Sequence, residues 1–340
     1  MPWCRAGPRW RPLPSCSCSC LSLVGRLNLK GVRQTDSNVL KNRFPHLGAV
    51  LQALLVTFLW STSWVLIKIG LKDIPALTFA GLRYSLAFLC LLPLALRPAR
   101  LRPLRGLSGP RWARLIVLGL LFYTVTQGAQ FLGLAYLPAV TVNLLLNFTT
   151  IVVALLGIFL LAERPTVLQW SGVLLNVIGI VIYFYPVAIP ASQAVGLIVV
   201  AVGVLANAGS SILGRRVNRD GDIPPLTVTM VSMGVGAIVL LATGILTQGL
   251  PRLSPINWAI IAWLAVVNTA FAFTLWNHTL RTLSAMESSI INNTMLVQIA
   301  VLAWLFLGEQ LTWQEGIGMA LAGLGALIVQ LRPQAQKGVR

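Results

Sequence analysis

Apolar runs of around twenty residues, each enough to cross a hydrocarbon core roughly 30 Å thick at about 1.5 Å per helical residue, recur along almost the whole chain. Backbone groups find no water partners in lipid, so spanning segments must be helices or closed barrels. Barrel strands alternate apolar and polar residues, whereas residues 151–162 are apolar on every face. The runs therefore predict membrane-spanning α-helices.

The composition agrees with a membrane protein. Hydrophobic residues make up 56% of the chain and charged residues only 10%, whereas a soluble domain carries roughly a quarter charged residues. The net charge of +18 could suggest nucleic acid, but the basic residues lie at helix ends and in loops, with no large soluble domain to hold a binding surface. Retention of Lys and Arg on the cytoplasmic side during insertion explains the charge, and no nucleic-acid partner is expected.

Ten spans with mostly short connections are predicted. They cover residues 48–69, 75–96, 115–135, 139–161, 166–185, 193–213, 225–247, 257–277, 285–307 and 312–331. Residues 1–46 are polar and basic and are expected to form a disordered cytoplasmic tail. Residues 47–190 form a first half of five helices, residues 191–332 a second half of five, and residues 333–340 a short cytoplasmic tail.

The distribution of basic residues predicts the orientation. With the N-terminus inside, all but four of the 26 Lys and Arg lie in inner segments. Lys68, Lys72 and Arg252 lie at outer ends or loops, and Arg83 lies within a span. Both termini are therefore expected on the cytoplasmic side of the cell membrane.

A duplication appears when the chain is compared with itself at an offset of 146 residues. Of the 50 aligned pairs between residues 134–183 and 280–329, 13 are identical. Among them are Asn147 with Asn293, Glu163 with Glu309, two glycine pairs and Thr166 with Thr312. Five spans per half is an odd number, so the second half must enter the membrane in the opposite sense. The sequence thus predicts an all-α, ten-helix 5+5 inverted repeat, a plan common among alternating-access transporters.

Several motifs resemble EamA-type transporters of the drug/metabolite transporter superfamily. The segment from Leu59 to Gly70 resembles the first helix of that family, and the segment from Ala80 to Tyr84 resembles its second-helix arginine signature. The acidic turns at Glu163 and Glu309 resemble the paired turns of the family, one in each half. The resemblance covers residues 48–331 and implies a carrier of small metabolites that often exports amino acids or related compounds.

The two turn acids favour a structural role over proton coupling. Thr166 with Gln169, and Thr312 with Glu315, have the spacing of capping boxes. Glu163 and Glu309 therefore lie in interfacial turns before the positive ends of helices. Glu287 has a similar capping context after Ser284.

Arg83 lies inside the second span, where an unpaired charge is expensive. Three readings stay open: the side chain extends towards water, pairs with an acid such as Glu309, or holds a substrate carboxylate. Lys68, near an outer end, is expected to extend its amine to the interface.

Polar and aromatic side chains inside the spans are the candidate substrate ligands, because amides facing lipid would cost several kcal/mol. They gather on the first, third and fourth helices of each half, as a central cavity requires, although hydrogen bonding between helices is the alternative for each. The candidates are Trp60, Ser63, Trp64, Tyr123, Gln127, Gln130, Asn143, Asn147, Asn207, Ser210, Asn268, Trp276, Asn292, Asn293 and Gln298.

The expected function is secondary transport, with outward export, of a small polar metabolite such as an amino acid. The alternatives are an integral membrane enzyme and a membrane assembly subunit without transport of its own. An enzyme would need a clustered His, Asp and Glu constellation, but the only histidines are His46 and His278. No catalytic residue, metal ligand, cofactor site or ATP-binding motif is expected, and the oligomeric state stays open.

Overall fold

The computed structural model describes residues 29–95, 104, 106–161, 166–185, 191–219, 223–279, 282–283 and 285–330, with side chains from His46 onward except at a few helical positions. Met1–Pro45 and His46–Arg340 form two separate units, each considered by itself. The predictions for residues 1–28 and 333–340, and for Glu163 and Ser284, lie outside the described residues.

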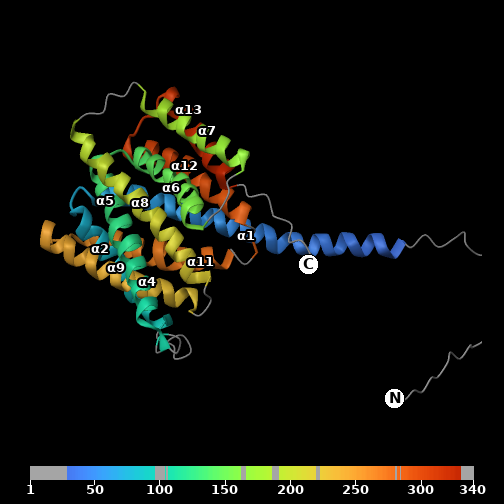
Figure 1. The fold of residues 1–340 in the computed structure, drawn as a ribbon, viewed down its shortest axis with the longest axis horizontal. Coiled ribbons are helices and arrows are strands. Elements are labelled where there is room, and N and C mark those ends of the chain that lie inside the picture. Colours follow the sequence, from blue (N-terminus) through green and yellow to red (C-terminus); the bar gives the residue numbers. More distant parts are fainter. Residues whose placement is uncertain are drawn as a thin grey trace, which may run out of the picture. The chain divides into compact units, whose positions relative to one another are not determined.

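Throughout the described ranges the regular elements are helices (Figure 1). The first half contains α1 (Leu29–Gly70), α2 (Ala76–Ala95), α4 (Gly109–Gly119), η2 (Leu120–Thr126), α5 (Gln127–Tyr136), α6 (Ala139–Leu161) and α7 (Val167–Phe184). The second half contains α8 (Ala191–Arg219), α9 (Pro225–Gln248), α10 (Pro255–Ala265), η3 (Val266–Phe271), α11 (Ala272–Thr279), α12 (Ala285–Leu307) and α13 (Trp313–Gln330). The elements η2 and η3 are π-helical segments inside otherwise continuous helices.

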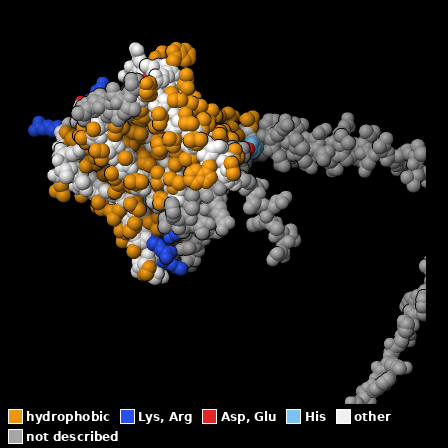
Figure 2. Space-filling model, turned by 45° about the horizontal axis from the view of Figure 1, so that its top comes forward, with side chains coloured by type: hydrophobic (Ala, Val, Ile, Leu, Met, Phe, Trp, Pro, Cys, Tyr) orange, Lys and Arg blue, Asp and Glu red, His pale blue; other side chains and the backbone are white. Residues whose placement is uncertain are grey.

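Eight helices in the described part of the chain are long and apolar enough to cross a membrane. Shorter apolar helical segments cover Ala139–Val153 and Trp313–Val329. On the face shown in Figure 2, apolar side chains cover most of the described surface, and Lys and Arg lie at its edges. The prediction of a multi-pass helical membrane protein is therefore confirmed, because such a surface suits lipid and not water.

Residues 29–45 form the first part of α1, and the expectation that residues 1–46 are a disordered cytoplasmic tail stays a prediction.

Helices α7 and α13 pack closely through glycines (Figure 1). A β-carbon at Gly172 would lie 2.8 Å from the carbonyl oxygen of Gly325, and one at Gly179 would lie 2.6 Å from that of Gly318. Residue numbers fall along α13 as they rise along α7, so the two helices run antiparallel. Only a residue without a side chain permits this approach of one backbone to another.

Helices α2 and α9 pack in the same antiparallel manner. A β-carbon at Gly81 would lie 2.5 Å from the Cα atom of Leu241, and one at Gly234 would lie 2.8 Å from the ring of Phe88. These two helices occupy equivalent places in the two halves, as α7 and α13 do. In both pairs, a helix of the first half therefore packs antiparallel against the equivalent helix of the second half.

Candidate functional site

Arg83 of α2 is buried, with 5% of its surface exposed. Its Nε donates a hydrogen bond of 3.3 Å to Oγ1 of Thr269, and its guanidinium carbon lies 5.2 Å from the ring centre of Tyr84 and 5.9 Å from that of Phe131. Within the described residues, no carboxylate forms an ion pair with it. Arg83 therefore neither reaches water nor pairs with Glu309, and two of its three predicted roles do not apply here.

The π-helical segment η3 connects Arg83 to α1. Thr269 of η3 accepts the Arg83 hydrogen bond, and the preceding residue, Asn268, donates its side-chain amide to the backbone carbonyl of Leu59 and, at 3.3 Å, to Oγ1 of Thr62. The Oδ1 atom of Asn268 is buried without a partner among the described residues. Two adjacent residues of the second half thus hold two helices of the first half.

Trp60 of α1 also contacts Asn268. Its indole Nε1 donates to the backbone carbonyl of Asn268 at 3.1 Å. Its ring lies 5.2 Å from that of Phe273 and 5.3 Å from that of Trp276. Trp60 and Trp276, both candidate residues, are therefore brought together in one aromatic cluster, where tilted rings at this distance attract one another.

A second cluster surrounds Tyr84, whose side chain lies next to Arg83. The Tyr84 hydroxyl donates to Oε1 of Gln127 at 2.6 Å, and its ring lies 5.6 Å from that of Tyr123. Gln127 and Tyr123 are therefore adjacent to the Arg83 cluster, and Gln127 is only partly buried. An amide and a guanidinium near one another, with aromatic side chains between them, suit a small polar solute.

Gln298 of α12 has a different role, because its amide is occupied by helix–helix contacts. Its Oε1 accepts from Ser61 at 2.9 Å, and its Nε2 donates to Thr57 at 3.3 Å and to Thr294 at 3.0 Å. The bonds with Ser61 and Thr57 join α12 of the second half to α1 of the first, and the bond to Thr294 lies within α12. The alternative considered for every polar candidate, interhelical hydrogen bonding, therefore applies to Gln298.

The candidates on α6 and α8 differ in whether their side chains form hydrogen bonds between helices. Asn207 of α8 donates to Thr149 of α6 at 3.3 Å, again joining the two halves, and Ser210 donates to the Asn207 carbonyl. Among the described residues, Asn147 donates only to the Asn143 carbonyl, one turn back on its own helix. The Nδ2 atom of Asn143 is buried and has no partner among the described residues, so an amide donor stays available on α6.

The other polar candidates are less tightly connected. Ser63 donates to the carbonyl of Trp60 in its own helix, and Gln130 is only partly buried. Asn293 carries a buried Nδ2 without a partner in the described part of the chain, whereas Asn292 is exposed. Asn293 therefore resembles Asn143 as an open donor, and Asn292 does not.

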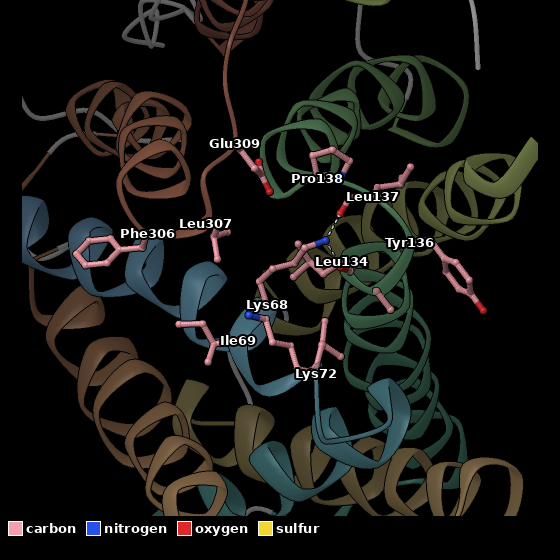
Figure 3. Close-up of a pocket in the computed structure, with 12 residues that line it drawn as sticks. Lys68, Ile69, Lys72, Leu134, Tyr136, Leu137, Pro138, Phe306, Leu307 and Glu309 are labelled. Atoms are coloured by element: carbon pink, nitrogen blue, oxygen red, sulfur yellow. Dashed lines mark hydrogen bonds between the residues drawn. The ribbon is translucent and has the colours of Figure 1, made fainter. Parts of the chain in front are cut away.

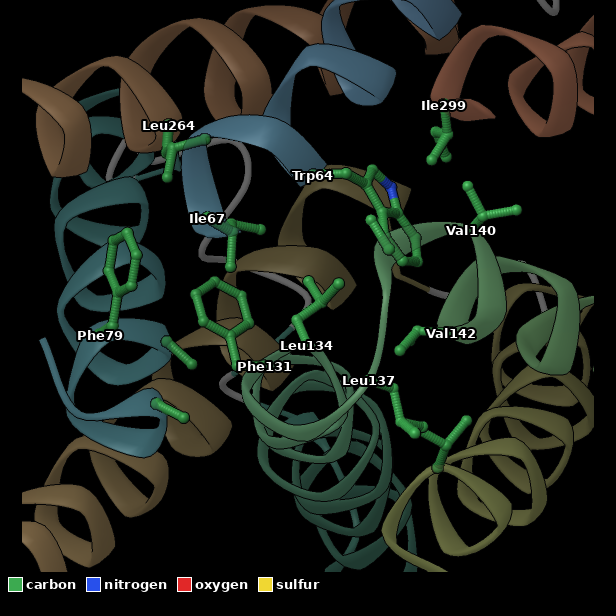
Figure 4. Packing of buried hydrophobic residues seen from close by; sticks show 14 of the residues in the cluster. Trp64, Ile67, Phe79, Phe131, Leu134, Leu137, Val140, Val142, Leu264 and Ile299 are labelled. Carbon is green, nitrogen blue, oxygen red and sulfur yellow. The ribbon is translucent and has the colours of Figure 1, made fainter. Parts of the chain in front are cut away.

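Trp64 lies one turn after Trp60 but packs in the apolar core. It is buried, and it points between Val140 of α6 and Ile299 of α12 (Figure 4). Its environment is that of a core side chain. The two tryptophans share one face of α1, but their side chains have different surroundings.

Glu309 binds the beginning of α6. Its Oε1 accepts from the backbone N–H of Ala139 at 2.8 Å, and its Oε2 from that of Val140 at 3.3 Å. Beside it, the amine of Lys68 donates to the carbonyls of Leu134 at 2.7 Å and Leu137 at 2.6 Å, where α5 ends. A carboxylate at a helix N-terminus and an ammonium at a C-terminus both oppose the helix dipoles.

Both predicted capping boxes are present. Thr166 and Gln169 exchange side-chain-to-backbone hydrogen bonds at the start of α7, and Thr312 and Glu315 do so at the start of α13. Glu287 of α12 lies 2.9 Å from Nε2 of His46, a contact that the sequence did not indicate. The turn acids in the described residues are therefore engaged in structural contacts.

The π-helical segments occupy equivalent positions in the two halves. η2 begins at Leu120 and η3 at Val266, which is 146 residues later. Tyr123 belongs to η2, and Asn268 and Thr269 belong to η3. π-Helical turns are rare and are frequent at functional sites, so the clusters described above lie at the irregular turns of both halves.

Sequence reasoning missed Thr269, Tyr84 and the threonines that surround Gln298. A threonine in a span carries little signal, because its hydroxyl usually bonds to its own helix. Thr269 itself donates to the carbonyl of Leu264 at 2.8 Å. Its position next to Asn268, and the position of Tyr84 next to Arg83, were the available signals.

Comparison with known proteins shows the family to which the chain belongs. The EamA-like transporter family matches residues 47–185 and again 194–331, and the chain belongs to this family. It is 28% identical over 304 residues to the uncharacterized transporter YvbV of Bacillus subtilis (strain 168), covering 84% of this chain and 93% of that protein. It is 27% identical over 218 residues to the protein PecM of Dickeya dadantii (strain 3937), covering 64% of this chain and 73% of that protein.

A solved structure, titled only as the crystal structure of a protein, has a similar fold. It aligns with a TM-score of 0.59 and 20% sequence identity, over 83% of this chain and 97% of that chain. The likeness concerns the fold alone.

Proposed function

We propose that this protein is a secondary transporter that exports a small polar metabolite carrying a carboxylate, such as an amino acid. The observation that carries the proposal is the buried Arg83 guanidinium, which has no acidic partner among the described residues. A buried charge without a counter-ion is costly in a membrane. A substrate carboxylate would supply the missing charge and could form two parallel hydrogen bonds with the guanidinium.

The surrounding groups suit the rest of such a solute. Gln127 provides an amide near Arg83 through Tyr84, and Asn143 and Asn293 carry buried amide donors without described partners. In the proposal these groups line a midplane cavity together with Trp60, Tyr123 and the other candidates of the first, third and fourth helices. Amides used in helix contacts, above all that of Gln298, fix the walls of the cavity.

The proposed mechanism is alternating access of a ten-helix 5+5 inverted repeat. Antiparallel packing of α7 on α13, and of α2 on α9, supports it, because equivalent helices of an inverted repeat run in opposite directions. First-helix contacts cross between the halves, as in Trp60 with Asn268 and Asn207 with Thr149. Rocking of one half on the other would then expose the Arg83 region to each side in turn.

The proposed location is the cell membrane, with both termini in the cytoplasm. The excess of Lys and Arg in the inner segments supports this orientation. The Lys68 and Glu309 contacts would then lie at the outer end. Their hydrogen bonds join α1 and the α12–α13 turn to the α5–α6 turn, so they would stabilise the structure closed on that side.

The experiment is uptake of radiolabelled amino acids into proteoliposomes that contain the purified full chain. We expect uptake of at least one amino acid and competition by other carboxylates, but no competition by the corresponding amino amide, which lacks the charge that Arg83 would bind. Arg83→Gln should lower transport roughly tenfold or more, since a charge-assisted hydrogen bond contributes about 1.5–3 kcal/mol.

Arg83→Lys and Arg252→Gln are the matched variants. The lysine keeps the charge but not the fork of donors, so partial transport is expected. Arg252 lies in the loop before α10 and is exposed, so removing its charge should leave transport unchanged. Equal competition by acid and amide, with folded Arg83→Gln protein still transporting, would overturn the proposal.

A further inference from the structure

A lateral apolar cavity lies beside α1, and Arg83 does not line it. It has a volume of about 600 Å³, lies between α1, α10 and α12, and has an apolar lining apart from Thr62. Among the residues that line it, Ile256, Trp263 and Phe306 are exposed. The cavity therefore opens sideways onto the surface that faces lipid, and its chemistry suits a hydrocarbon chain.

The apolar cavity has the length of a single acyl chain. Its α1 side runs from Phe58 to Ile69, which corresponds to about 16 Å at about 1.5 Å per residue. That is about half of a hydrocarbon core roughly 30 Å thick, the depth of one leaflet. A chain of a bilayer lipid could therefore lie along the cavity without leaving its own leaflet.

A second cavity, called the polar cavity because charged side chains line it, adjoins one end of the apolar cavity. This cavity has a volume of about 520 Å³ and contains Lys68, Lys72 and Glu309 (Figure 3). Ile69 and Phe306 line both cavities. The two spaces thus meet where α1 and α12 end, with charged side chains just beyond the apolar part.

The polar cavity carries charges of both signs. Lys72 is exposed, and its amine has no hydrogen-bond or ion-pair partner within the described residues, while Lys68 already donates to two carbonyls. Glu309 accepts two backbone N–H groups and retains lone pairs for a further donor. Asp73, next to Lys72 in sequence, accepts a hydrogen bond from Asn257 of α10 at 3.3 Å.

We propose that the two cavities together bind one phospholipid whose headgroup carries both a phosphate and a primary ammonium. An acyl chain occupies the apolar cavity, the phosphate lies against Lys72 and Lys68, and the ammonium donates to Glu309. The chain passes from one hydrocarbon environment to another and gains little hydrophobic free energy, so the contacts of the charged end supply the affinity and select the headgroup. The site is independent of the substrate and of the transport direction.

Other headgroups fit less well. A headgroup with a phosphate but no ammonium would place an anion beside Glu309 without compensation. A trimethylated ammonium keeps its charge but has no N–H to donate. Phosphatidylethanolamine should therefore bind more tightly than phosphatidylglycerol or phosphatidylcholine with the same acyl chains.

The test is native mass spectrometry of the purified full chain in detergent, with equal amounts of the dioleoyl forms of these three lipids. The wild-type protein should retain one phosphatidylethanolamine in preference to the other two. Lys72→Gln should weaken that retention about tenfold, as expected for loss of a charge-assisted contact. Arg252→Gln, which removes an exposed charge that lines neither cavity, should match the wild type.

A second pair of variants tests the apolar part. Ala259 lines the apolar cavity and is exposed, so Ala259→Trp fills the cavity without entering the core and should abolish retention of all three lipids. Ala242→Trp on α9 adds the same bulk at an exposed position outside both cavities and should leave retention unchanged. Equal retention of the three lipids, preference for phosphatidylglycerol, or wild-type retention by Ala259→Trp would each overturn the proposal.

Discussion

The side-chain amide of Asn176 on α7 donates a 2.6 Å hydrogen bond to the backbone carbonyl of Ala322 on α13, and the two residues are 146 positions apart, one repeat length. Phe88 and Gly234, which meet between α2 and α9, are separated by the same interval. A residue contacts its own counterpart only at the axis that relates two copies. These two pairs therefore support the proposed inverted repeat, whose axis would pass near them.

The glycines beside Asn176 should be intolerant of larger side chains. Gly179→Leu would place a β-carbon 2.6 Å from the Gly318 carbonyl oxygen, and overpacking of this kind costs about 1–3 kcal/mol. We expect a lower yield of monodisperse protein and a lower unfolding temperature. Gly316→Leu on α13, where no atom lies within 4 Å of an added β-carbon, is the control and should be nearly neutral; equal losses in both variants would contradict the packing argument.

Amides near the Arg83 cluster should affect transport more than stability. Gln127→Ala removes the acceptor of the Tyr84 hydroxyl, and we expect it to lower transport severalfold while the protein still folds. Asn147→Ala loses only a bond within its own helix and should also keep the folded yield. Transport into proteoliposomes, normalised to folded protein, is the measurement, and normal transport with reduced yield would assign both amides to structure.

Glu309 should contribute to stability through the start of α6. Glu309→Ala removes acceptors from two backbone N–H groups, which should lower the free energy of unfolding by about 1–3 kcal/mol. Glu309→Gln keeps one acceptor and should cost less. Thermal unfolding in detergent measures both, with Glu315→Gln in the capping box of α13 for comparison. Unchanged stability with lost transport would instead indicate proton coupling by Glu309.

Ser61 and Gln298 should be energetically coupled. Their 2.9 Å hydrogen bond joins α1 to α12, and such a bond contributes about 0.5–1.5 kcal/mol. We expect Ser61→Ala and Gln298→Leu each to destabilise the protein, and the double variant to lose less than the sum of the two. A double-mutant cycle by thermal unfolding measures the coupling, and strict additivity would exclude it.

The sequence predicted the positions of the helices well because apolar length alone determines whether a segment can span lipid. It also predicted both capping boxes, since each depends on residues three positions apart.

The sequence alone could not predict which residues the candidate residues contact. Trp60 and Trp64 share a helix face, yet one contacts the second half of the chain and the other packs in the core. Such differences depend on which helix lies opposite, which a single sequence does not encode locally. The π-helical turns were missed for a related reason, because apolar periodicity over a few residues does not distinguish five-residue from four-residue hydrogen bonding.

The shared register of η2 and η3 has a consequence for the history of the chain. A π-helical turn holds one residue more than the α-helical turn it replaces, so it records an insertion. Leu120 and Val266 begin these turns one repeat length apart, although Tyr123 and Thr269, which follow them, have diverged in chemistry. The same irregular turn at the same register in both halves is the pattern expected if the extra residue was present before the two halves diverged in their side chains.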